Sequence, residues 1–201
     1  EQGKDGFSST HSVREMIRKH YPDYYFWNKY PVELCVPIRK INEEWGVLGN
    51  FFPCQIGIDG VPFKSAEHLF QTMKFCDEQS VREMYQRNSK PWAKRLENQG
   101  KRRPDWPMMI VDAMKFCLMA KYQQVPLFRE ELRRTGGLFI IEDETNRKAT
   151  SWGTQLKDVC YEGNNLLGRL LMELRDAGSL TYHLPENALD FLAFIKPAML
   201  K

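Results

Sequence analysis

Apolar and polar residues alternate with the period of a β-strand around residue 57, and the pattern becomes helical directly afterwards. Residues 55–58 and 61–63 alternate on either side of Asp59-Gly60, a pair that tolerates positive φ, so this stretch predicts a β-hairpin. Pro62 lacks a backbone donor and makes the second strand an edge. The hydroxyl of Ser65 can then cap a helix over residues 66–76.

This predicted helix carries a polar stripe. Glu67, Gln71 and Lys74 are spaced i, i+4 and i+7 and therefore share one face, while apolar residues occupy the rest. Such a stripe is ordinarily the solvated face of an amphipathic helix. The alternative is the wall of a site, and the hairpin beside the helix favours that alternative.

The same helical period recurs along most of the chain. Ser12 and Glu15 have the spacing of a capping box, which predicts a short helix to about residue 20. The aromatic segment at residues 21–27 is expected to cover the core. Further helices are predicted at residues 78–88, 91–99, 107–124, 126–134, 164–175 and 185–194.

Strand patterns are few. They are found at residues 33–40 and 138–142, besides the hairpin. Residues 143–163 are polar and irregular apart from Trp152-Gly153 and are predicted as a long loop. The expected fold class is α+β, a mostly α-helical single domain with a small β-sheet or hairpin element.

Length and composition narrow the class of protein. A chain of 201 residues with 42% apolar residues fits one globular domain. Its five cysteines, an odd number without a C-x-x-C pair, suggest neither a disulfide framework nor a zinc cluster. No run reaches the roughly 20 apolar residues of a membrane helix, and no signal pattern is visible. We expect a cytoplasmic protein with no metal and no membrane partner.

Charge is informative where it is clustered. The formal net charge of +3, from 29 basic and 26 acidic residues, is too small to indicate nucleic acid by itself. A basic segment before Asp105-Trp106 can cradle phosphates and a stacked base, the alternative being a solubilising loop. Its basic residues are Lys94, Arg95, Lys101, Arg102 and Arg103.

Several motifs follow one another between residues 45 and 176. They are GNFFP, an Asp-Gly turn, SAEHLFQTMKF, DW, TSWG and EGNNLLGRLLMELR. In this order they resemble the NADAR family, also called YbiA-like N-glycosidases. The resemblance implies a NADAR-like catalytic domain over residues 45–176. Residues 1–44 are then an N-terminal extension, a short helix, aromatic segment and strand packing on the core, and residues 177–201 are a C-terminal helical extension.

The resemblance implies an enzyme that hydrolyses a ribosyl C1–N bond without a cofactor. Family members are described as acting on riboflavin-pathway intermediates that carry ribose phosphate, and others as removing ADP-ribose from guanine. The second activity reverses DNA ADP-ribosylation and implies an antitoxin paired with a guanine-specific ADP-ribosyltransferase toxin.

Three hypotheses for this chain follow. The leading one is removal of ADP-ribose from ADP-ribosylated guanine, in DNA or as a free nucleotide. The first alternative is hydrolysis of a ribosylamino-pyrimidine phosphate of the riboflavin pathway. The second is a non-enzymatic module that binds ADP-ribose or a nucleotide, which could keep its tryptophans without needing a catalytic glutamate.

Five family positions can be placed on this sequence. The helix glutamate corresponds to Glu67, the lysine of Q-x-x-K-F to Lys74, and the asparagine of the first motif to Asn50. The two motif tryptophans correspond to Trp106 and Trp152. Cleavage of a ribosyl C–N bond builds positive charge on the sugar, so a carboxylate is needed near C1, and Glu67 is the candidate. Lys74 either holds a phosphate or forms a Schiff base with the opened sugar.

The remaining aromatic and polar candidates are expected to bind substrate. Trp106 and Trp152 would stack on the base or adenine, the alternative being core or rim tryptophans. Arg103 in the basic segment is a candidate for phosphate, and Gln71 is a candidate on the face of Glu67.

For three further polar residues, the alternative to a role in substrate binding is a purely structural role. Asn50 hydrogen-bonds either the ribose or its own turn, and Asn165 is either a substrate contact or the cap of the helix that follows. His68 is expected to be a structural histidine.

The chain departs from the family pattern in one place. Many members have an aspartate three residues before the tryptophan of the W-G motif, where this chain has Ala149. If that aspartate holds the riboflavin-type substrate, the riboflavin hypothesis is weakened. Glu142, Asp143 or Glu144 could replace it, and Glu142 is also a binding candidate because it ends a predicted strand.

Overall fold

The helices begin at capping residues that the sequence already shows. In the computed structural model, which describes residues 12–196, the Ser12 hydroxyl accepts a hydrogen bond from Glu15 N and the Ser65 hydroxyl accepts one from His68 N. The outer parts of the two predicted extensions, residues 1–11 and 197–201, lie outside this range. The α-helices are α1 (Val13–His20), α2 (Ala66–Thr72), α3 (Glu78–Arg87), α4 (Lys90–Asn98), α5 (Trp106–Gln124), α6 (Pro126–Arg134) and α7 (Leu166–Ala177).

The strands form three small sheets. The predicted hairpin is confirmed, and its turn residues Asp59 and Gly60 have φ of 49° and 84°. A parallel pair and an antiparallel sheet with the order β1-β7-β6 complete the set. The strands are β1 (Asn28–Pro31), β2 (Cys35–Ile38), β3 (Ile56–Ile58), β4 (Val61–Phe63), β5 (Phe139–Glu142), β6 (Gln155–Lys157) and β7 (Cys160–Gly163), with β2 paired to β5.

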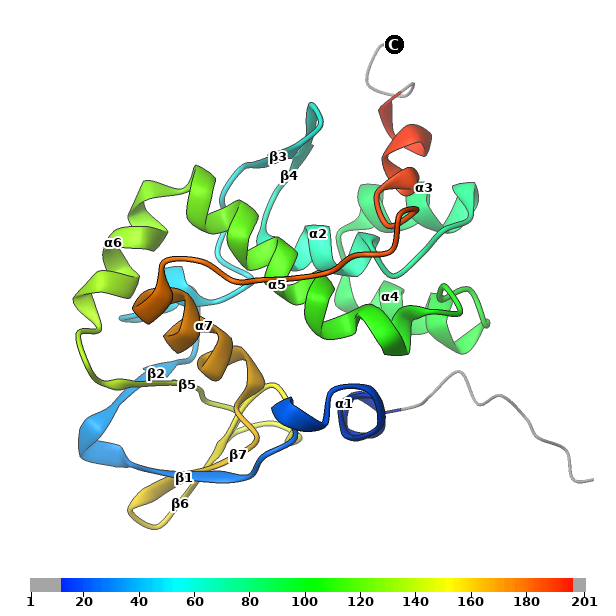
Figure 1. The fold of residues 1–201 in the computed structure, drawn as a ribbon. Helices are drawn as coiled ribbons and strands as arrows, with labels where there is room; N and C mark the ends of the chain where they lie inside the picture. The colour runs from blue at the N-terminus through cyan, green and yellow to red at the C-terminus, as the bar shows by residue number, and fades with distance from the viewer. Residues whose placement is uncertain (1–11, 197–201) are drawn as a thin grey trace, which may run out of the picture.

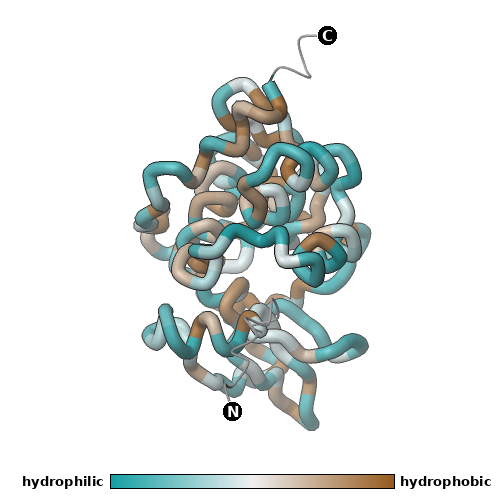
Figure 2. The backbone as a smooth tube through the Cα atoms, turned by 90° about the vertical axis from the view of Figure 1, so that its right-hand side faces the viewer, coloured by the Kyte–Doolittle hydropathy of each residue, from teal (hydrophilic) through white to brown (hydrophobic). Residues whose placement is uncertain are grey.

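Helices and strands occupy different parts of the molecule. Figure 1 shows α2–α6 above the strands β1, β2 and β5–β7, with α7 between the two groups. Helix α7 packs on β5, and α5 packs on α1, α2 and α6. Figure 2 shows apolar positions gathered inside the helical part and polar positions along its outer loops. The fold class is therefore α+β and mostly helical, as predicted. Within residues 12–196, no helix combines the length and apolar character needed to cross a membrane.

The predicted loop at residues 143–163 is wrong in its second half. It contains the hairpin β6–β7, whose turn includes Asp158 at φ 57°. The hairpin pairs with β1, which comes from the end of the aromatic segment and was not predicted either. Both strands depend on this distant pairing, and the exposure of Leu156 and Val159 on β6 and its turn weakens the local pattern.

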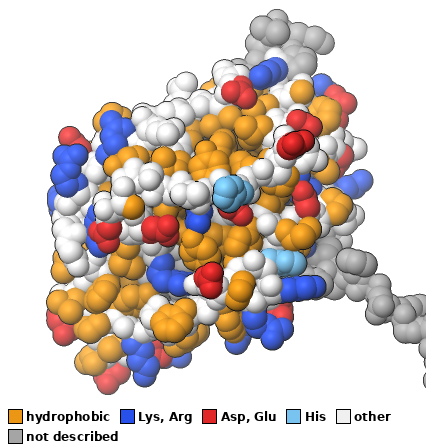
Figure 3. Space-filling model, viewed as in Figure 1, with side chains coloured by type: hydrophobic (Ala, Val, Ile, Leu, Met, Phe, Trp, Pro, Cys, Tyr) orange, Lys and Arg blue, Asp and Glu red, His pale blue; other side chains and the backbone are white. Residues whose placement is uncertain are grey.

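The aromatic segment covers the core only in part. Tyr21, Tyr24 and Tyr25 pack against core residues, whereas Phe26 and Trp27 are each 60% exposed. Figure 3 shows other exposed apolar side chains at the lower left, over the strands β1, β2 and β5–β7. They include Val32, Leu34, Phe139, Leu156 and Val159.

Two predicted helices are shorter than expected. Helix α2 ends at Thr72, four residues early, because the next amides bond three residues back: Lys74 N donates to Gln71 O. Lys74 therefore lies in a turn rather than on the helix. Residues 185–194 form turns and a short 3-10 helix, Asp190–Phe194.

Candidate active site

Helix α2 holds a carboxylate almost out of solvent. Every residue of the helix is buried, so its polar stripe is not a solvated face, and Glu67 is only 9% exposed. Its backbone N–H donates to Asn50 O over 2.9 Å, and Gln71 Nε2 donates to Glu67 Oε1 over 2.6 Å. The glutamate and glutamine of the predicted stripe thus act as one unit. Gln71 Oε1 is itself buried and has no hydrogen-bond partner among the described residues.

This unit forms one side of a pocket of about 290 Å³. Residues from three parts of the chain surround it: the segment before β3, the start of α2, and the junction between α3 and α4. The lining residues are Phe51, Pro53, Lys64, Ser65, Glu67, Gln71, Asn88, Ser89 and Lys90. Of the predicted site residues, the pocket therefore includes Glu67 and Gln71.

A second buried carboxyl lies near the first. Arg147 Nη2 donates to Glu142 Oε1 over 2.6 Å, while Glu142 Oε2 has no partner among the described residues. Burial raises the pKa of Glu142 to about 7, the charges of Glu144 and Glu67 add to the rise, and Arg147 opposes it. Near neutral pH this carboxyl can therefore hold or release a proton.

The other two acids of this strand end already have partners. Arg39 Nε donates to Asp143 Oδ2 over 2.8 Å, and Glu144 accepts from the backbone and hydroxyl of Thr150. Of the three acids that could replace the aspartate missing at Ala149, Glu142 is the one with an unpartnered oxygen.

The two predicted stacking tryptophans meet on one phenylalanine. The ring of Phe70 lies 5.2 Å from that of Trp106 and 5.7 Å from that of Trp152, measured between centroids. Trp106 is 1% exposed and belongs to the core, whereas Trp152 is partly buried at its edge. Neither lines the pocket beside Glu67. In this conformation, stacking on Trp106 has no route from solvent.

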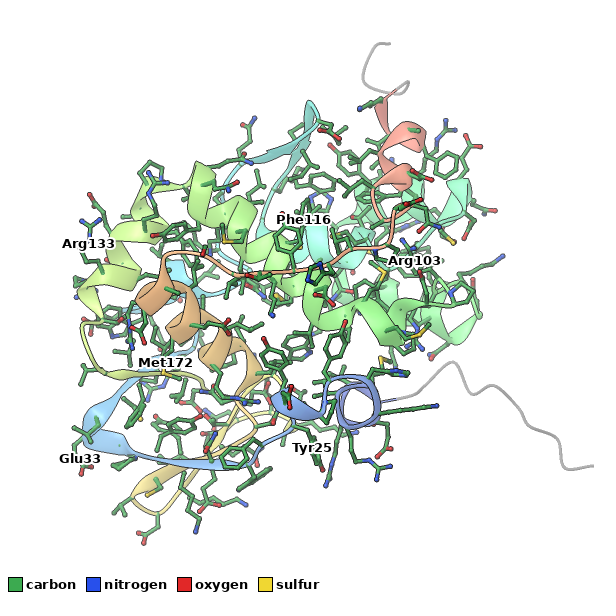
Figure 4. The ribbon with its side chains drawn as sticks, viewed as in Figure 1. Tyr25, Glu33, Arg103, Phe116, Arg133 and Met172 are labelled. Carbon is green, nitrogen blue, oxygen red and sulfur yellow. The ribbon has the colours of Figure 1, made fainter. Side chains whose placement is uncertain are left out.

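Lys74 and Arg103 are both held by carboxylates. Lys74 Nζ lies 2.9 Å from Glu97 Oε1 and also within 6 Å of the Phe70 and Trp106 ring centroids. The Arg103 guanidinium makes two hydrogen bonds with Asp105 and a third with Asn187. Figure 4 shows Arg103 beside the C-terminal segment that it ties down. The Glu67–Gln71 pocket includes neither residue.

The two candidate asparagines are buried on either side of the site. Asn165 Oδ1 accepts from Glu142 N and its Nδ2 donates to Ile140 O, so it makes no side-chain cap and instead fixes the strand end at Glu142. Asn50 donates to Met114 Sδ and keeps Oδ1 without a partner among the described residues. Asn50 thus supports Glu67 through its backbone and keeps one side-chain acceptor.

His68 has the structural role expected of it. Its Nδ1 accepts from Lys64 N, and its Nε2 lies 2.8 Å from Tyr85 O. Burial lowers its pKa. The ring therefore joins β4, α2 and α3.

A buried lysine fixes the wall that carries Asn50. Lys121 in the last turn of α5 is fully buried, and its ammonium donates to Val47 O and Gly49 O over 2.7 and 2.9 Å. Burial lowers the pKa of Lys121 to about 8. Its hydrogen bonds attach the segment before Asn50 to the longest helix.

The pocket residues that the sequence interpretation missed include Phe51, Lys64 and Lys90. Phe51 lies inside the GNFFP motif but was not singled out, although it is 51% exposed. Lys64 and Lys90 carry no local signal, because the fold alone brings the α3–α4 junction to α2. Among residues 12–196, no group of three His, Cys, Asp or Glu side chains is placed to hold a metal ion.

Comparison with known proteins decides the family. The model of the NADAR domain matches residues 20–177, well over half of the chain. This chain belongs to the NADAR family. The matched region starts before residue 45 and includes β1 and β2, which pair with β7 and β5.

Named relatives of this NADAR protein fall into two groups. A riboflavin biosynthesis protein of Vibrio vulnificus is 32% identical over 153 residues, which are 75% of this chain and 40% of that protein. The N-glycosidases YbiA of Escherichia coli and Shigella boydii are each 31% identical over 138 residues, covering 67% of this chain and 82% of theirs. The NMR structure of E. coli YbiA superposes with a TM-score of 0.58 at 29% identity, covering 71% of this chain and 83% of that one.

Proposed function

We propose that this NADAR protein is an N-glycosidase that hydrolyses a ribosyl C1–N bond, and that its substrate is ADP-ribosylated guanine in DNA or as a free nucleotide. The observation that carries the proposal is the buried Glu67 carboxylate, fixed by Gln71 and facing a pocket. The names of the YbiA relatives support the same reaction class. A guanine-specific ADP-ribosyltransferase is the class of enzyme that must supply this substrate.

Glu67 and Glu142 have different acid–base roles in the proposed reaction. As the C1–N bond breaks, its electron pair goes to the nitrogen, which takes a proton from Glu142 through an intervening water, because Glu142 does not line the pocket. Glu67 stabilises the positive charge on C1 and accepts a proton from the water that attacks there. The products are a ribose with a C1 hydroxyl and a base with an N–H, and transfer of the proton from Glu67 to Glu142 through solvent restores the site. A pKa of about 7 suits Glu142 to this acid role.

Lys74 offers a covalent alternative that remains a prediction. Its amine would attack the opened sugar aldehyde, lose water and leave a Schiff base. Borohydride reduction during turnover would then trap a covalent adduct that the Lys74→Ala variant lacks. Absence of an adduct in the wild-type protein would contradict this route.

The decisive experiment replaces Glu67 by Gln. We expect base release from an ADP-ribosylated guanine oligonucleotide to fall by about 10³-fold, because the change removes an acid–base group and little volume. Binding should stay within about tenfold, which is about 1.4 kcal/mol. Glu130→Gln, on the exposed side of α6, is the matched control. Full turnover by Glu67→Gln would refute the assignment and leave the binding-module alternative.

A second substrate is favoured by one comparison. The similarity to the riboflavin biosynthesis protein of Vibrio vulnificus supports a ribosylamino-pyrimidine phosphate. The same wild-type protein should therefore be assayed on both substrates. Release of the pyrimidine with higher kcat/KM than release of guanine would replace the leading substrate by this one.

A further inference from the structure

The pocket beside Glu67 carries two lysines without acidic partners. Lys64 and Lys90 both line it, and within residues 12–196 neither forms an ion pair with a carboxylate. Lys74 and Arg103, the cations expected to hold phosphate, are already neutralised by Glu97 and Asp105. The positive charge available to an anionic ligand is therefore on the side of Lys64 and Lys90.

The start of α4 adds neutral donors to the same side. Ser89 caps this nine-residue helix by accepting from Trp92 N, and Ser89 and Lys90 both line the pocket. Pro91 has no N–H, and the N–H groups of Trp92 and Ala93 already donate to Ser89. The helix dipole and the Lys90 N–H are therefore what α4 adds in favour of an anion there. The Ser89 hydroxyl proton remains free to be donated, since the cap uses only its oxygen.

A half-exposed aromatic ring faces these cations. Phe51 is 51% exposed, and Lys90 Nζ lies 5.7 Å from the centroid of its ring. An exposed phenylalanine beside a lysine offers a planar surface for a base and a charge for its phosphate.

An acceptor on the opposite side also lacks a partner. Gln71 is 4% exposed and lines the pocket, and its Oε1 atom has no hydrogen bond from any described residue. Buried acceptors are normally satisfied, so a ligand donor such as a ribose hydroxyl is the natural complement. The pocket thus has an acceptor side at Glu67–Gln71 and a cationic, aromatic side at Phe51–Lys90.

We infer that Lys64, Lys90 and the start of α4 bind the phosphate of a ribosyl phosphate group, and that Phe51 stacks on an aromatic ring attached to it. This inference rests on the proposed function and assigns phosphate recognition away from Lys74 and Arg103. A volume of about 290 Å³ is at the small end of ligand pockets. It therefore encloses a ribose phosphate, and the rest of a larger substrate lies against Phe51 outside it.

Binding of simple sugars tests the phosphate assignment. The probes are ribose 5-phosphate and ribose, titrated by calorimetry into the wild-type chain and the Lys90→Gln and Lys64→Gln variants. We expect ribose 5-phosphate to bind at least about tenfold more tightly than ribose, and each variant to lose about tenfold for the phosphate sugar alone. Lys19→Gln removes an exposed charge on α1, away from the pocket, and should change neither affinity. Equal binding of the two sugars, or unchanged binding by both pocket variants, would overturn the inference.

ADP-ribose tests the ring assignment. It should bind the wild-type protein about tenfold more tightly than ribose 5-phosphate, because stacking contributes roughly 1–3 kcal/mol per base. Phe51→Leu should remove that gain and leave ribose 5-phosphate unchanged, whereas Phe26→Leu, at another exposed phenylalanine, should have no effect. An unchanged preference in Phe51→Leu would overturn this part.

Failure of this inference and of the proposed function can be told apart. The titrations measure equilibrium binding and can be repeated with the Glu67→Gln variant, in which the proposed function predicts turnover reduced by about 10³-fold. Lost phosphate selectivity with normal Glu67-dependent turnover overturns the subsite alone. Normal selectivity with turnover that does not require Glu67 overturns the proposed function alone.

Discussion

The polar side chains near the two ends of α2 differ in whether they have partners within the fold. Just before its start, Lys64 lines the pocket, which also includes the side chain of Gln71 with its buried, unpartnered acceptor. Beyond its end, Lys74 is paired with Glu97, and Arg103 is bound by Asp105 and Asn187. Both regions contain residues that the sequence marks as candidates for the same site.

The difference separates residues whose polar groups are paired within the fold from residues whose polar atoms have no partner and are available to a ligand. We call the second set the ligand-awaiting group. A charge with a carboxylate partner stabilises the local structure and has little left to offer a substrate. A buried polar atom without a partner is rare in native proteins and costs stability. Unpartnered atoms in a pocket therefore locate ligand recognition better than the charge of a segment does. Three experiments test this distinction, in order of decreasing expected effect.

The largest effect is expected at Glu142, whose unpartnered oxygen belongs to the ligand-awaiting group. Its pKa is raised to about 7, so the folded state holds a proton that the unfolded state releases from about pH 4.5 upward. Its stabilising contribution is complete below that pH and is lost as pH rises through about 7. Between about pH 5 and pH 8 this loss is about 3 kcal/mol, at about 1.4 kcal/mol per pKa unit.

The Glu142→Gln variant isolates that contribution. Urea unfolding should show it about as stable as the wild type at low pH and more stable above neutral pH, since it has no proton to lose. The ionisable groups common to both proteins cancel in the difference. Identical pH dependence in both proteins would mean that Glu142 is an ordinary solvated acid.

A smaller effect is expected for Arg103→Ala, which removes a charge that is paired within the fold. The change breaks the paired contact with Asp105 and the link to Asn187, and it should lower the free energy of unfolding by about 2 kcal/mol. Lys101→Ala, an exposed neighbour, should change it by less than about 0.5 kcal/mol. Ribose 5-phosphate affinity should be unchanged in both variants. Weaker phosphate binding by Arg103→Ala at unchanged stability would reverse the comparison.

The smallest effect concerns the Lys74–Glu97 pair. A double-mutant cycle with Lys74→Met and Glu97→Gln should give a coupling free energy of about 1 kcal/mol, because both side chains are mostly buried. The measurement is chemical unfolding of the four proteins. A coupling of zero would show that Lys74 is free for substrate, and it would restore Lys74 to the ligand-awaiting group.

Local rules were sufficient for most of the fold. The Asp59-Gly60 turn and the caps at Ser12 and Ser65 follow from the chemistry of a few neighbouring residues, and the structure confirms each. Helices such as α5 and α6 were predicted within a residue of their ends because their apolar period is long and proline marks their start.

Distant pairing explains what could not be predicted. Strand β1 and the hairpin β6–β7 define each other across more than a hundred residues, and neither has a strong pattern alone. The early end of α2 follows from a bridge between Phe75 and Arg102, which a helical period cannot show.

The residues of the candidate site also differ in whether the sequence alone reveals them. Glu67 was marked by the family resemblance, and Gln71 by its place one helical turn further along the same face. Lys90 reaches the same pocket from another helix, and only the fold reveals that contact. The carboxylate partners of Lys74 and Arg103 were likewise invisible in the sequence, which marked both residues as unpaired cations.

The hydrogen bonds of Lys121 have a consequence for the ligand selectivity of the pocket. Its ammonium is anchored in the core and holds two carbonyls of the segment that leads to Asn50 and Phe51. That wall is therefore in place before any ligand arrives, and it inherits the rigidity of the longest helix. We therefore expect a ligand to be selected by its fit to this wall rather than by movement of the wall around it.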